Sequence, residues 1–361
     1  ARIRTLEPRR DIEWMDAEQR RVVAMRALVT ADDAYHPEPI PDLTVSLARL
    51  RAEGSAWSGE ELGRGAQLLR SSRLTRDALG AEAGAMVSAV LHPFVQPLVA
   101  AKRVEDEIER AIDPDGSVRD EASGALRRLR RELRGAQAEL IQLLERAMAK
   151  LEPHQRVPDM SVTMRNGRYV IPVRREGRGA VGGIVHDESA TRGTVFVEPP
   201  AAIEFGNRIR ALEGEERDEV ERILAELTAA LRPLREGMIA SLEALIALDV
   251  LYARARFAEE LGCAPASFVH AHEGCSLRDA RHPLLLARGG TVVPFDLEMA
   301  PGERTLLLSG PNTGGKTVLL KAVGLISALA QSGVPAPVGA ESRVPVFDDC
   351  FADIGDEQSI Q

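Results

Sequence analysis

An eight-residue segment, GPNTGGKT at positions 310–317, has the residue types and spacing of a phosphate-binding loop. Its glycines let backbone N–H groups turn toward an anion, and a lysine and a threonine complete the pattern G-x-x-x-x-G-K-[ST]. We expect Lys316 to contact the β and γ phosphates of ATP, and the hydroxyl of Thr317 to hold Mg²⁺. The predicted nucleotide-binding residues are Gly310, Pro311, Asn312, Thr313, Gly314, Gly315, Lys316 and Thr317.

The segments on either side of this loop predict the elements that would position it. Residues 304–309 (RTLLLS) are typical of a buried strand, and residues 318–332 of a helix that Gly333 ends, with Pro335 beyond. A strand, a loop and a helix in that order direct the loop's N–H groups and the helix N-terminus at a phosphate. A glycine-rich turn without a ligand is the alternative, and these flanks disfavour it.

Lysine usage also singles out this loop. The chain has 46 Lys and Arg residues, of which only Lys102, Lys150, Lys316 and Lys321 are lysines. A compact ammonium suits a phosphate better than a planar guanidinium does, so we interpret Lys316 as a residue kept for chemistry. A genome that favours arginine codons would explain the same count.

Hydrolysis needs a further carboxylate at the end of a second strand. Residues 344–350 (VPVFDDC) imitate such a strand end, but Pro345 interrupts the apolar run. The sequence leaves this segment open as a metal-binding strand end.

Two long helices are predicted from apolar residues spaced three or four apart. One apolar stripe covers residues 118–151, after a turn at 113–116 (DPDG), and another covers residues 220–245. Pro233 predicts a kink in the second helix. Two long stripes that flank one insertion indicate an antiparallel pair of arms.

The insertion between the arms has the alternation of β-strands. In residues 161–173 two β-rich runs flank Asn166-Gly167, the strongest short signal for a hairpin, because both turn positions need a positive φ. Residues 181–185 and 194–199 predict further strands. We expect a small sheet at the end of the helix pair.

Arginines gather around this predicted sheet, although the chain has a net charge of −9. Seven arginines, Arg156 and the six named at the end of this paragraph, stand against four carboxylates and give a local net charge of +3. The four carboxylates are Asp159, Glu176, Asp187 and Glu188. Such a patch is able to contact nucleic-acid phosphates, and a solvated surface is the equal alternative. The candidate nucleic-acid contacts are Arg165, Arg168, Arg174, Arg175, Arg178 and Arg192.

Two other clusters have the residue types of catalytic or metal sites. Residues 186–189 (HDES) are adjacent in sequence, which rarely forms a triad, so we interpret them as a turn. Cys263, His270, His272 and Cys275 match no zinc spacing, and we expect buried thiols and surface histidines.

The remaining features bound the location of the protein. Three cysteines form no disulfide framework and favour the reducing cytoplasm. The uncharged residues 322–340 include Gln331, Ser332 and two prolines, so no membrane span is expected. The chain begins with Ala1 and stops at Gln361 without a terminating signal, and we expect it to be a fragment of a longer protein.

Taken in order, these segments resemble the MutS family of ATPases. The likeness is strongest to its second bacterial branch, endonuclease MutS type two, and it is weakest before about residue 100. The segments that carry it are the loop 310–317 with 318–325 (VLLKAVGL), 279–285 (DARHPLL), 353–361 (DIGDEQSIQ), 162–173 and 182–199 of the clamp, and 248–258 of the lever.

The resemblance implies a homodimer whose ATPase domains sandwich two nucleotides, with helical levers that run to a clamp around DNA. It implies action on branched or recombination-intermediate DNA to suppress homologous recombination, and endonuclease activity through a carboxy-terminal domain. Members of the branch are also linked to splitting collided ribosomes, so a ribosome or its rRNA is the alternative partner. The family's signature loop, catalytic carboxylate and nuclease domain are expected beyond Gln361. The resemblance therefore implies no catalytic residue within the chain, and we expect weak nucleotide binding and no hydrolysis by the chain alone.

The predicted fold class is multidomain, with an α lever, a small β clamp and the first half of an α/β P-loop ATPase domain. The predicted domains are a helical core at 1–117, an arm helix at 118–152, the clamp tip at 153–201, the returning arm at 202–264 and the truncated ATPase domain at 265–361. Two rival ATPases fit less well. An architectural coiled-coil ATPase has far longer arms, and a small-molecule kinase needs no such helical region before its loop.

Overall fold

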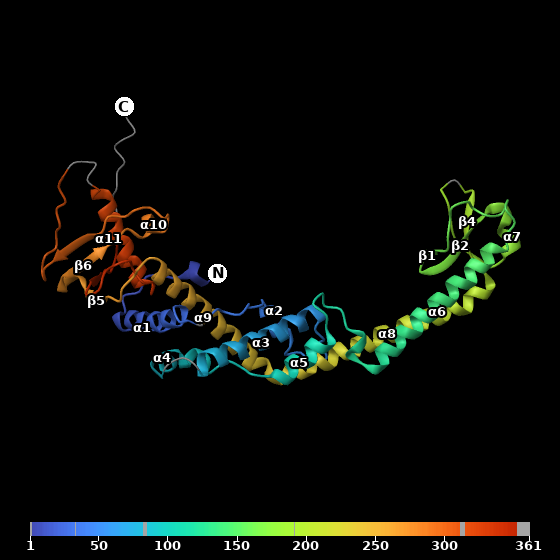
Figure 1. The fold of residues 1–361 in the computed structure, drawn as a ribbon, viewed down its shortest axis with the longest axis horizontal. Coiled ribbons are helices and arrows are strands. Elements are labelled where there is room, and N and C mark those ends of the chain that lie inside the picture. The colour runs from blue at the N-terminus through green and yellow to red at the C-terminus, as the bar shows by residue number, and fades with distance from the viewer. Residues whose placement is uncertain (1, 33, 82–84, 191, 311–314, 352–361) are drawn as a thin grey trace, which may run out of the picture. The chain divides into compact units, whose positions relative to one another are not determined.

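The computed structural model describes residues 2–32, 34–81, 85–190, 192–310 and 315–351, which form two compact units. The first unit comprises Ala1–Pro41, Gln67–Ala101 and Glu236–Gln361, and the second comprises Asp42–Ala66 and Lys102–Arg235. Each unit combines helices with a four-stranded sheet, which confirms a mixed α and β, multidomain class. Element labels follow Figure 1.

The second unit is built around two long helices, α6 and α8, that run side by side with a small sheet at one end (Figure 1). Its helices are α2 (Thr44–Arg49), the first part of α3 (Gly59–Ala81), α5 (Lys102–Ala111), α6 (Gly124–Ala149), α7 (Arg178–Val181) and α8 (Pro200–Leu231), with short 3-10 turns η2 (Asp120–Ala122), η3 (Arg175–Gly177) and η4 (Arg232–Leu234).

Helix α6 forms where the first apolar stripe predicts a helix. Ser123 caps its N-terminus, because the Ser123 hydroxyl accepts a hydrogen bond from Leu126 N at 2.9 Å. The predicted stripe is the buried face, and Leu129, Leu140 and Leu144 pack into the core of the arm. Full burial of each leucine contributes about 1.5 to 3 kcal/mol to that core.

The returning helix α8 begins earlier than its stripe predicts, at Pro200, and it buries Ile209, Leu212 and Ile223. Val220 and Leu224, which the stripe places on the apolar face, are only half-buried. Polar contacts between the helices join residues 96 apart at Ser123–Glu219 and 86 apart at Arg130–Glu216, so the pair is antiparallel, as predicted. Pro233 lies in η4, which interrupts the helix as expected before α9 begins.

The sheet of the second unit has the strand order β1-β2-β4-β3, and all its neighbours are antiparallel. Asn166 and Gly167 connect the first two strands with φ of 50° and 71°, which confirms the predicted hairpin. The strands are β1 (Thr163–Arg165), β2 (Arg168–Arg174), β3 (Ile184–Glu188) and β4 (Thr194–Glu198).

One face of this sheet packs on the helix pair through Ile171, Val173, Val195 and Val197. The strand predicted at 181–185 begins only at Ile184, because α7 extends to Val181 and two glycines with positive φ follow it. The interpretation of residues 186–189 as a turn was wrong. His186, Asp187 and Glu188 lie in β3, where a register shift at His186 marks an irregularity in the pairing with β4.

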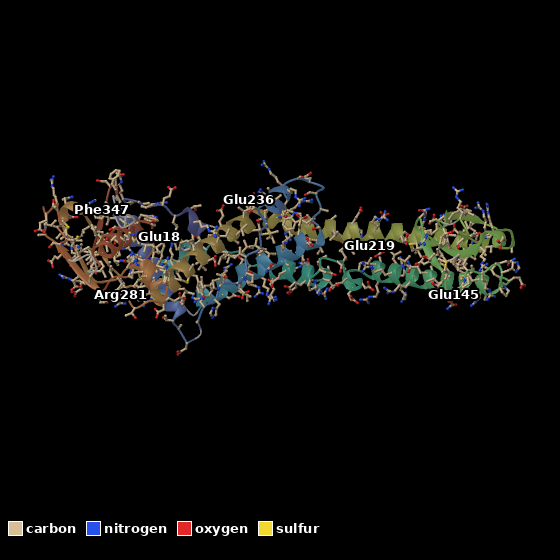
Figure 2. The ribbon with its side chains drawn as sticks, turned by 90° about the horizontal axis from the view of Figure 1, so that it is seen from above. Glu18, Glu145, Glu219, Glu236, Arg281 and Phe347 are labelled. Carbon is tan, nitrogen blue, oxygen red and sulfur yellow. The ribbon has the colours of Figure 1, made fainter. Side chains whose placement is uncertain are left out.

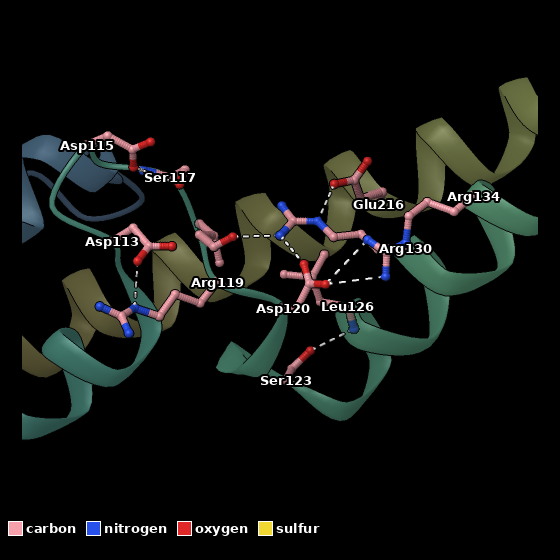
Figure 3. Close-up of polar contacts among 11 residues, drawn as sticks. Asp113, Asp115, Ser117, Arg119, Asp120, Ser123, Leu126, Arg130, Arg134 and Glu216 are labelled. Carbon is pink, nitrogen blue, oxygen red and sulfur yellow. Dashed lines mark hydrogen bonds and ion pairs between the residues drawn. The ribbon is translucent and has the colours of Figure 1, made fainter. Parts of the chain in front are cut away.

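Hydrogen bonds of charged side chains join α6 to α8 and to the segment before α6 (Figure 3). The guanidinium of Arg130 donates to Glu216 Oε1, Asp120 Oδ1 and the carbonyl of Val118, each at 2.7 Å. Hydrogen bonds from Arg130 hold the pKa of Asp120 below its usual range. The turn at 113–116 is present as predicted, with Gly116 N donating to Asp113 O at 2.9 Å.

Glu219, labelled near the middle of the arms in Figure 2, makes the arm pair sensitive to acid. Hydrogen bonds from Arg222, and then from Ser123, lower the pKa of Glu219 to about 2. Because the folded pKa lies below the ordinary value of 4.5 for a glutamate, this stabilisation is present above about pH 4.5 and is lost as the pH falls toward about 2.

We predict that Glu219→Gln flattens the loss of stability across this acid window. The measurement is the free energy of unfolding in urea at a series of pH values between about 6 and about 2.5 for wild type and variant. Equal slopes for the two proteins would contradict the assignment.

The first unit contains the remaining helices and the second sheet. Its helices are α1 (Ile12–Val29), the last part of α3, α4 (Ala85–Val95), α9 (Arg235–Glu260, from Glu236 on), α10 (Pro283–Leu286) and α11 (Lys316–Gln331), with 3-10 turns η1 (Arg2–Thr5) and η5 (Ala271–Glu273). Its strands are β5 (Ser267–His270), β6 (Cys275–Ala280), β7 (Phe295–Met299) and β8 (Arg343–Val346). None of the helices described is long and apolar enough to cross a bilayer.

The sheet of the first unit has the order β5-β8-β6-β7, in which only β5 and β8 are parallel. Its core joins Leu277, Leu297 and Val344 to Ile326 and Ala330 of α11. The strand predicted at 304–309 is absent, and Leu306 and Leu307 are 44% and 87% exposed. A strand needs the backbone of a neighbour for its hydrogen bonds, and no described strand pairs with this segment.

Candidate nucleotide-binding site

Helix α11 begins within the predicted loop, two residues earlier than the sequence predicts. Gly315 is its N-cap with φ of 75°, and Leu319 N donates the first helical hydrogen bond to Gly315 O at 2.9 Å. The backbone N–H groups of this first turn lie at the positive end of the helix. The first turn contains no acidic residue. This helix end is suited to an anion.

Lys316 and Thr317 stand in the first turn of α11. The ammonium of Lys316 donates a hydrogen bond to the carbonyl of Gly310, at the start of the loop, and Thr317 is exposed. The ammonium therefore lies beside Gly310, the first residue of the predicted loop. Pro311, Asn312, Thr313 and Gly314 lie outside the described residues.

The carboxyl end of α11 is fixed by backbone hydrogen bonds. Gly333 has φ of 70°, its N–H donates to Ala330 O at 3.0 Å, and Val334 N donates to Leu329 O at 2.9 Å. This is the Schellman arrangement that glycine at such a position favours, and it confirms the predicted helix end. The carboxyl end of α11 is thereby well fixed.

A cleft of about 1100 Å³ lies beside α11, and most of its lining is apolar. Leu306, Leu319, Leu320 and Phe351 contribute to it, and Leu320 and Phe351 are 55% and 92% exposed. His282 also lines the cleft, and its buried Nδ1 has no hydrogen-bond partner among the described residues.

The segment proposed to imitate a catalytic strand end does form a strand, β8, which tolerates Pro345 in a parallel pair with β5. The carboxylates after it face solvent and pair with one arginine. Arg10 lies 3.3 Å from Asp348 and 3.7 Å from Asp349. Residues 353–361 lie outside the described residues.

The two cysteine thiols of the suspected metal cluster are buried, whereas His270 and His272 are exposed, as predicted. Burial raises the pKa of the Cys263 thiol to about 12, so this thiol stays protonated. The only close grouping of metal-ligating side chains found in the described part of the chain is elsewhere, at Glu105, Asp106 and Glu109.

The structure divides the six candidate arginines of the tip. Three pair with carboxylates: Arg165 with Asp187 at 3.2 Å, Arg168 with Glu198 at 3.3 Å and Arg175 with Glu188 at 3.6 Å. Arg174 donates to the carbonyl of Arg156, and the guanidinium groups of Arg178 and Arg192 form no ion pair with any described residue.

Sequence reasoning missed the residue that organises this region. Glu198 is buried, and its carboxylate lies 2.7 Å from His186 Nε2 and 3.3 Å from Arg168 Nη1. Arg168 also donates to Asn207 of α8 at 2.9 Å. A single glutamate at the end of an apolar strand carries no sequence signal that would reveal such a role.

Comparisons with known proteins place the chain in a family. No family model matches the chain. It is 57% identical to the endonuclease MutS2 of Gemmatimonas aurantiaca across the whole chain, which covers 44% of that relative. It is 37% identical to endonuclease MutS2 of Geobacillus kaustophilus across the whole chain, covering 46% of it, and 44% identical to that of Pelotomaculum thermopropionicum over 75% of the chain, covering 34%.

The chain thus spans less than half the length of these relatives. The alignments with two of them nevertheless run through the helical segments, the tip and the loop without leaving out any part of the chain. With these identities, the chain belongs to the endonuclease MutS2 family.

Proposed function

We propose that the intact protein is an ATP-dependent, DNA-binding ATPase that acts on branched or recombination-intermediate DNA and suppresses homologous recombination. One observation carries the proposal. Lys316 and Thr317, which match the loop pattern, form the N-terminus of α11, and the first turn of that helix contains no acidic residue. The names of the relatives describe endonucleases, and endonuclease activity of the intact protein is part of the proposal.

Lys316 and Thr317 fit a nucleoside triphosphate with Mg²⁺. Lys316 brings a cation to the helix end, and the neighbouring exposed Thr317 offers a hydroxyl as a metal ligand. When bound, Mg²⁺ would neutralise charge on the phosphates. Lys316 would exchange its bond to the Gly310 carbonyl for a phosphate oxygen, because a charged acceptor forms the stronger hydrogen bond.

We propose that the chain alone binds nucleotide weakly and does not hydrolyse it. The exposed apolar cleft supports this, because such a surface is suited to packing against more protein. In the intact protein, further chain of the kind the relatives carry would cover the cleft and supply the catalytic carboxylate. A homodimer with two sandwiched nucleotides completes the proposal.

We propose that the tip of the second unit meets DNA through its exposed arginines. Arg178 and Arg192 are the best contacts, because neither guanidinium pairs with a described carboxylate or carbonyl, whereas Arg174 donates to the carbonyl of Arg156. The other three form ion pairs with carboxylates, namely Arg165, Arg168 and Arg175. Breaking these ion pairs would offset part of the binding free energy gained from contacts with DNA phosphates. The contacts would read the phosphate backbone and not the base sequence.

The test is the salt dependence of binding by the intact protein to branched DNA, linear DNA and ribosomes, with and without ATP. We predict the tightest binding to branched DNA. Replacing Arg178 and Arg192 by alanine should make the plot of log K against log salt less steep by about two, since each phosphate contact contributes roughly one to the magnitude of the slope.

The matched control is Arg103→Ala with Arg128→Ala, which changes the net charge equally at exposed positions outside the tip. This control should leave the slope as in wild type. An unchanged slope in the Arg178 and Arg192 variant would remove the tip assignment, and preference for ribosomes would favour the alternative partner.

A further inference from the structure

We propose that Gln331, at the last turn of the loop helix α11, is a positioning residue that transmits the nucleotide state of α11 to α1 and α9. The inference rests on the proposed nucleotide function of the loop. It concerns only the first unit, to which α1, α11 and α9 from Glu236 onward belong. It assigns a role to a buried glutamine that has no part in the candidate site itself.

Gln331 is 6% exposed, and its side-chain amide joins two separate segments. Its Nε2 donates to the carbonyl of Arg9 at 3.1 Å and to that of Phe347 at 2.9 Å, and its Oε1 accepts from Phe347 N at 3.1 Å. Its backbone carbonyl accepts from Arg9 N at 2.8 Å. One residue therefore ties α11 to the segment before α1 and to the end of β8.

Gly333, just beyond the end of α11, packs closely against side chains of α1 and α9. A Cβ added at Gly333 would lie 2.9 Å from the ring of Trp14, and 3.3 Å from both Arg254 Nη1 and Glu18 Cγ. Arg254 of α9 donates to buried Glu18 of α1, which also accepts from Arg21. The end of α11 thus abuts a buried ion pair that joins the other two helices; Glu18 and Phe347 are labelled in Figure 2.

Phosphate binding at the N-terminus of α11 would displace the other end of the helix, where Gln331 contacts Arg9 and Phe347. A helix of the 16 residues in α11 is about 24 Å long and moves as a stiff rod. Phosphate binding acts on its N-terminus, whereas Gln331 holds its other end. If α11 slid relative to Arg9 or Phe347, buried hydrogen bonds would be left unpaired, so the attached segments are expected to move with it.

A second glutamine offers a matched control. Gln19 of α1 exchanges the same kind of side-chain hydrogen bonds with a backbone, donating to Ala266 O at 2.7 Å and accepting from Ala266 N at 2.9 Å. It joins α1 to Ala266, immediately before β5, and its side chain forms no hydrogen bond with a described residue of α11. Losing these bonds should disturb packing to a comparable degree without opening the link to the loop helix.

The experiment follows hydrogen exchange of the amides in α1, α9 and α11 of the intact protein, with and without the non-hydrolysable analogue AMP-PNP and Mg²⁺. The variants are Gln331→Met, which removes the side-chain hydrogen bonds at similar length, Gln331→Glu, which keeps only the acceptor for Phe347 N, and Gln19→Met. Nucleotide affinity is measured for each protein to show that the loop remains folded.

We expect wild type and Gln19→Met to show nucleotide-dependent exchange in all three helices. Both Gln331 variants should bind the analogue and respond in α11, but the response of α1 and α9 should fall by about 2- to 30-fold. A full response of α1 and α9 in the Gln331 variants, or an equal loss in Gln19→Met, would overturn this inference alone. Failure of wild type to bind the analogue would instead overturn the proposed function.

Discussion

Lys316→Ala in the intact protein is expected to weaken ATP binding by about 10- to 100-fold, as for the loss of a hydrogen bond between charged groups. Turnover should fall by about 100-fold or more, because the ammonium also stabilises the charge that develops on the transferred phosphate. The reason is local, since Lys316 stands in the first turn of α11 and its Nζ donates to Gly310 O, at the start of the predicted loop. The measurements are ATP titration and steady-state phosphate release.

Lys321→Ala is the matched control, because it removes the same charge from an exposed position five residues further along α11. It should bind and turn over ATP as wild type does. Lys316→Arg separates charge from shape, and it should recover little, because a planar guanidinium does not replace a compact ammonium among phosphates. Unchanged turnover in Lys316→Ala would remove the nucleotide assignment.

The sequence predicts well those elements whose causes lie close together in the chain. The hairpin follows from Asn166 and Gly167, which accept a positive φ at low cost, and the end of α11 follows from Gly333 for the same reason. The buried face of α6 follows from the spacing of its leucines. Each of these signals is complete within a few residues.

The failures concern elements that depend on a distant partner. Residues 304–309 have the apolar content of a buried strand, but a strand also needs a neighbour, and sequence content alone does not supply one. Residues 186–189 were interpreted as a turn because adjacent residues rarely form a triad, yet Asp187 and Glu188 pair with β4, and His186, Asp187 and Glu188 lie in an edge strand. Pairing across the chain decided both cases.

The candidate arginines illustrate the same limit for charge. Their clustering is visible in the sequence, but the carboxylates that neutralise three of them come from β3 and β4, up to 30 residues away. A net charge of +3 therefore does not tell which cations are available to a ligand. The placement of Glu198 and Asp187 by the sheet makes that distinction.

Glu198→Ala is expected to destabilise the tip by about 3 to 5 kcal/mol, the range for removing one partner of a buried ion pair. The carboxylate is 3% exposed and serves both His186 and Arg168, whose side chain is only 16% exposed. Its removal would leave a poorly solvated guanidinium without its carboxylate. The measurement is native-state hydrogen exchange of the amides in β2 and β4, which reports the local free energy of opening.

Arg168→Ala should destabilise the same strands, whereas Arg178→Ala, at an exposed position of the same tip, should change their stability by less than about 0.5 kcal/mol. The double variant Glu198→Ala with Arg168→Ala should lose less than the sum of the two single variants, because the uncompensated charge is gone. Additive losses would contradict a coupled pair.

A different outcome would overturn the division of the six arginines by their carboxylate partners. In that outcome Arg168→Ala weakens DNA binding while β2 and β4 exchange as in wild type, and Arg168 is then a direct contact to DNA.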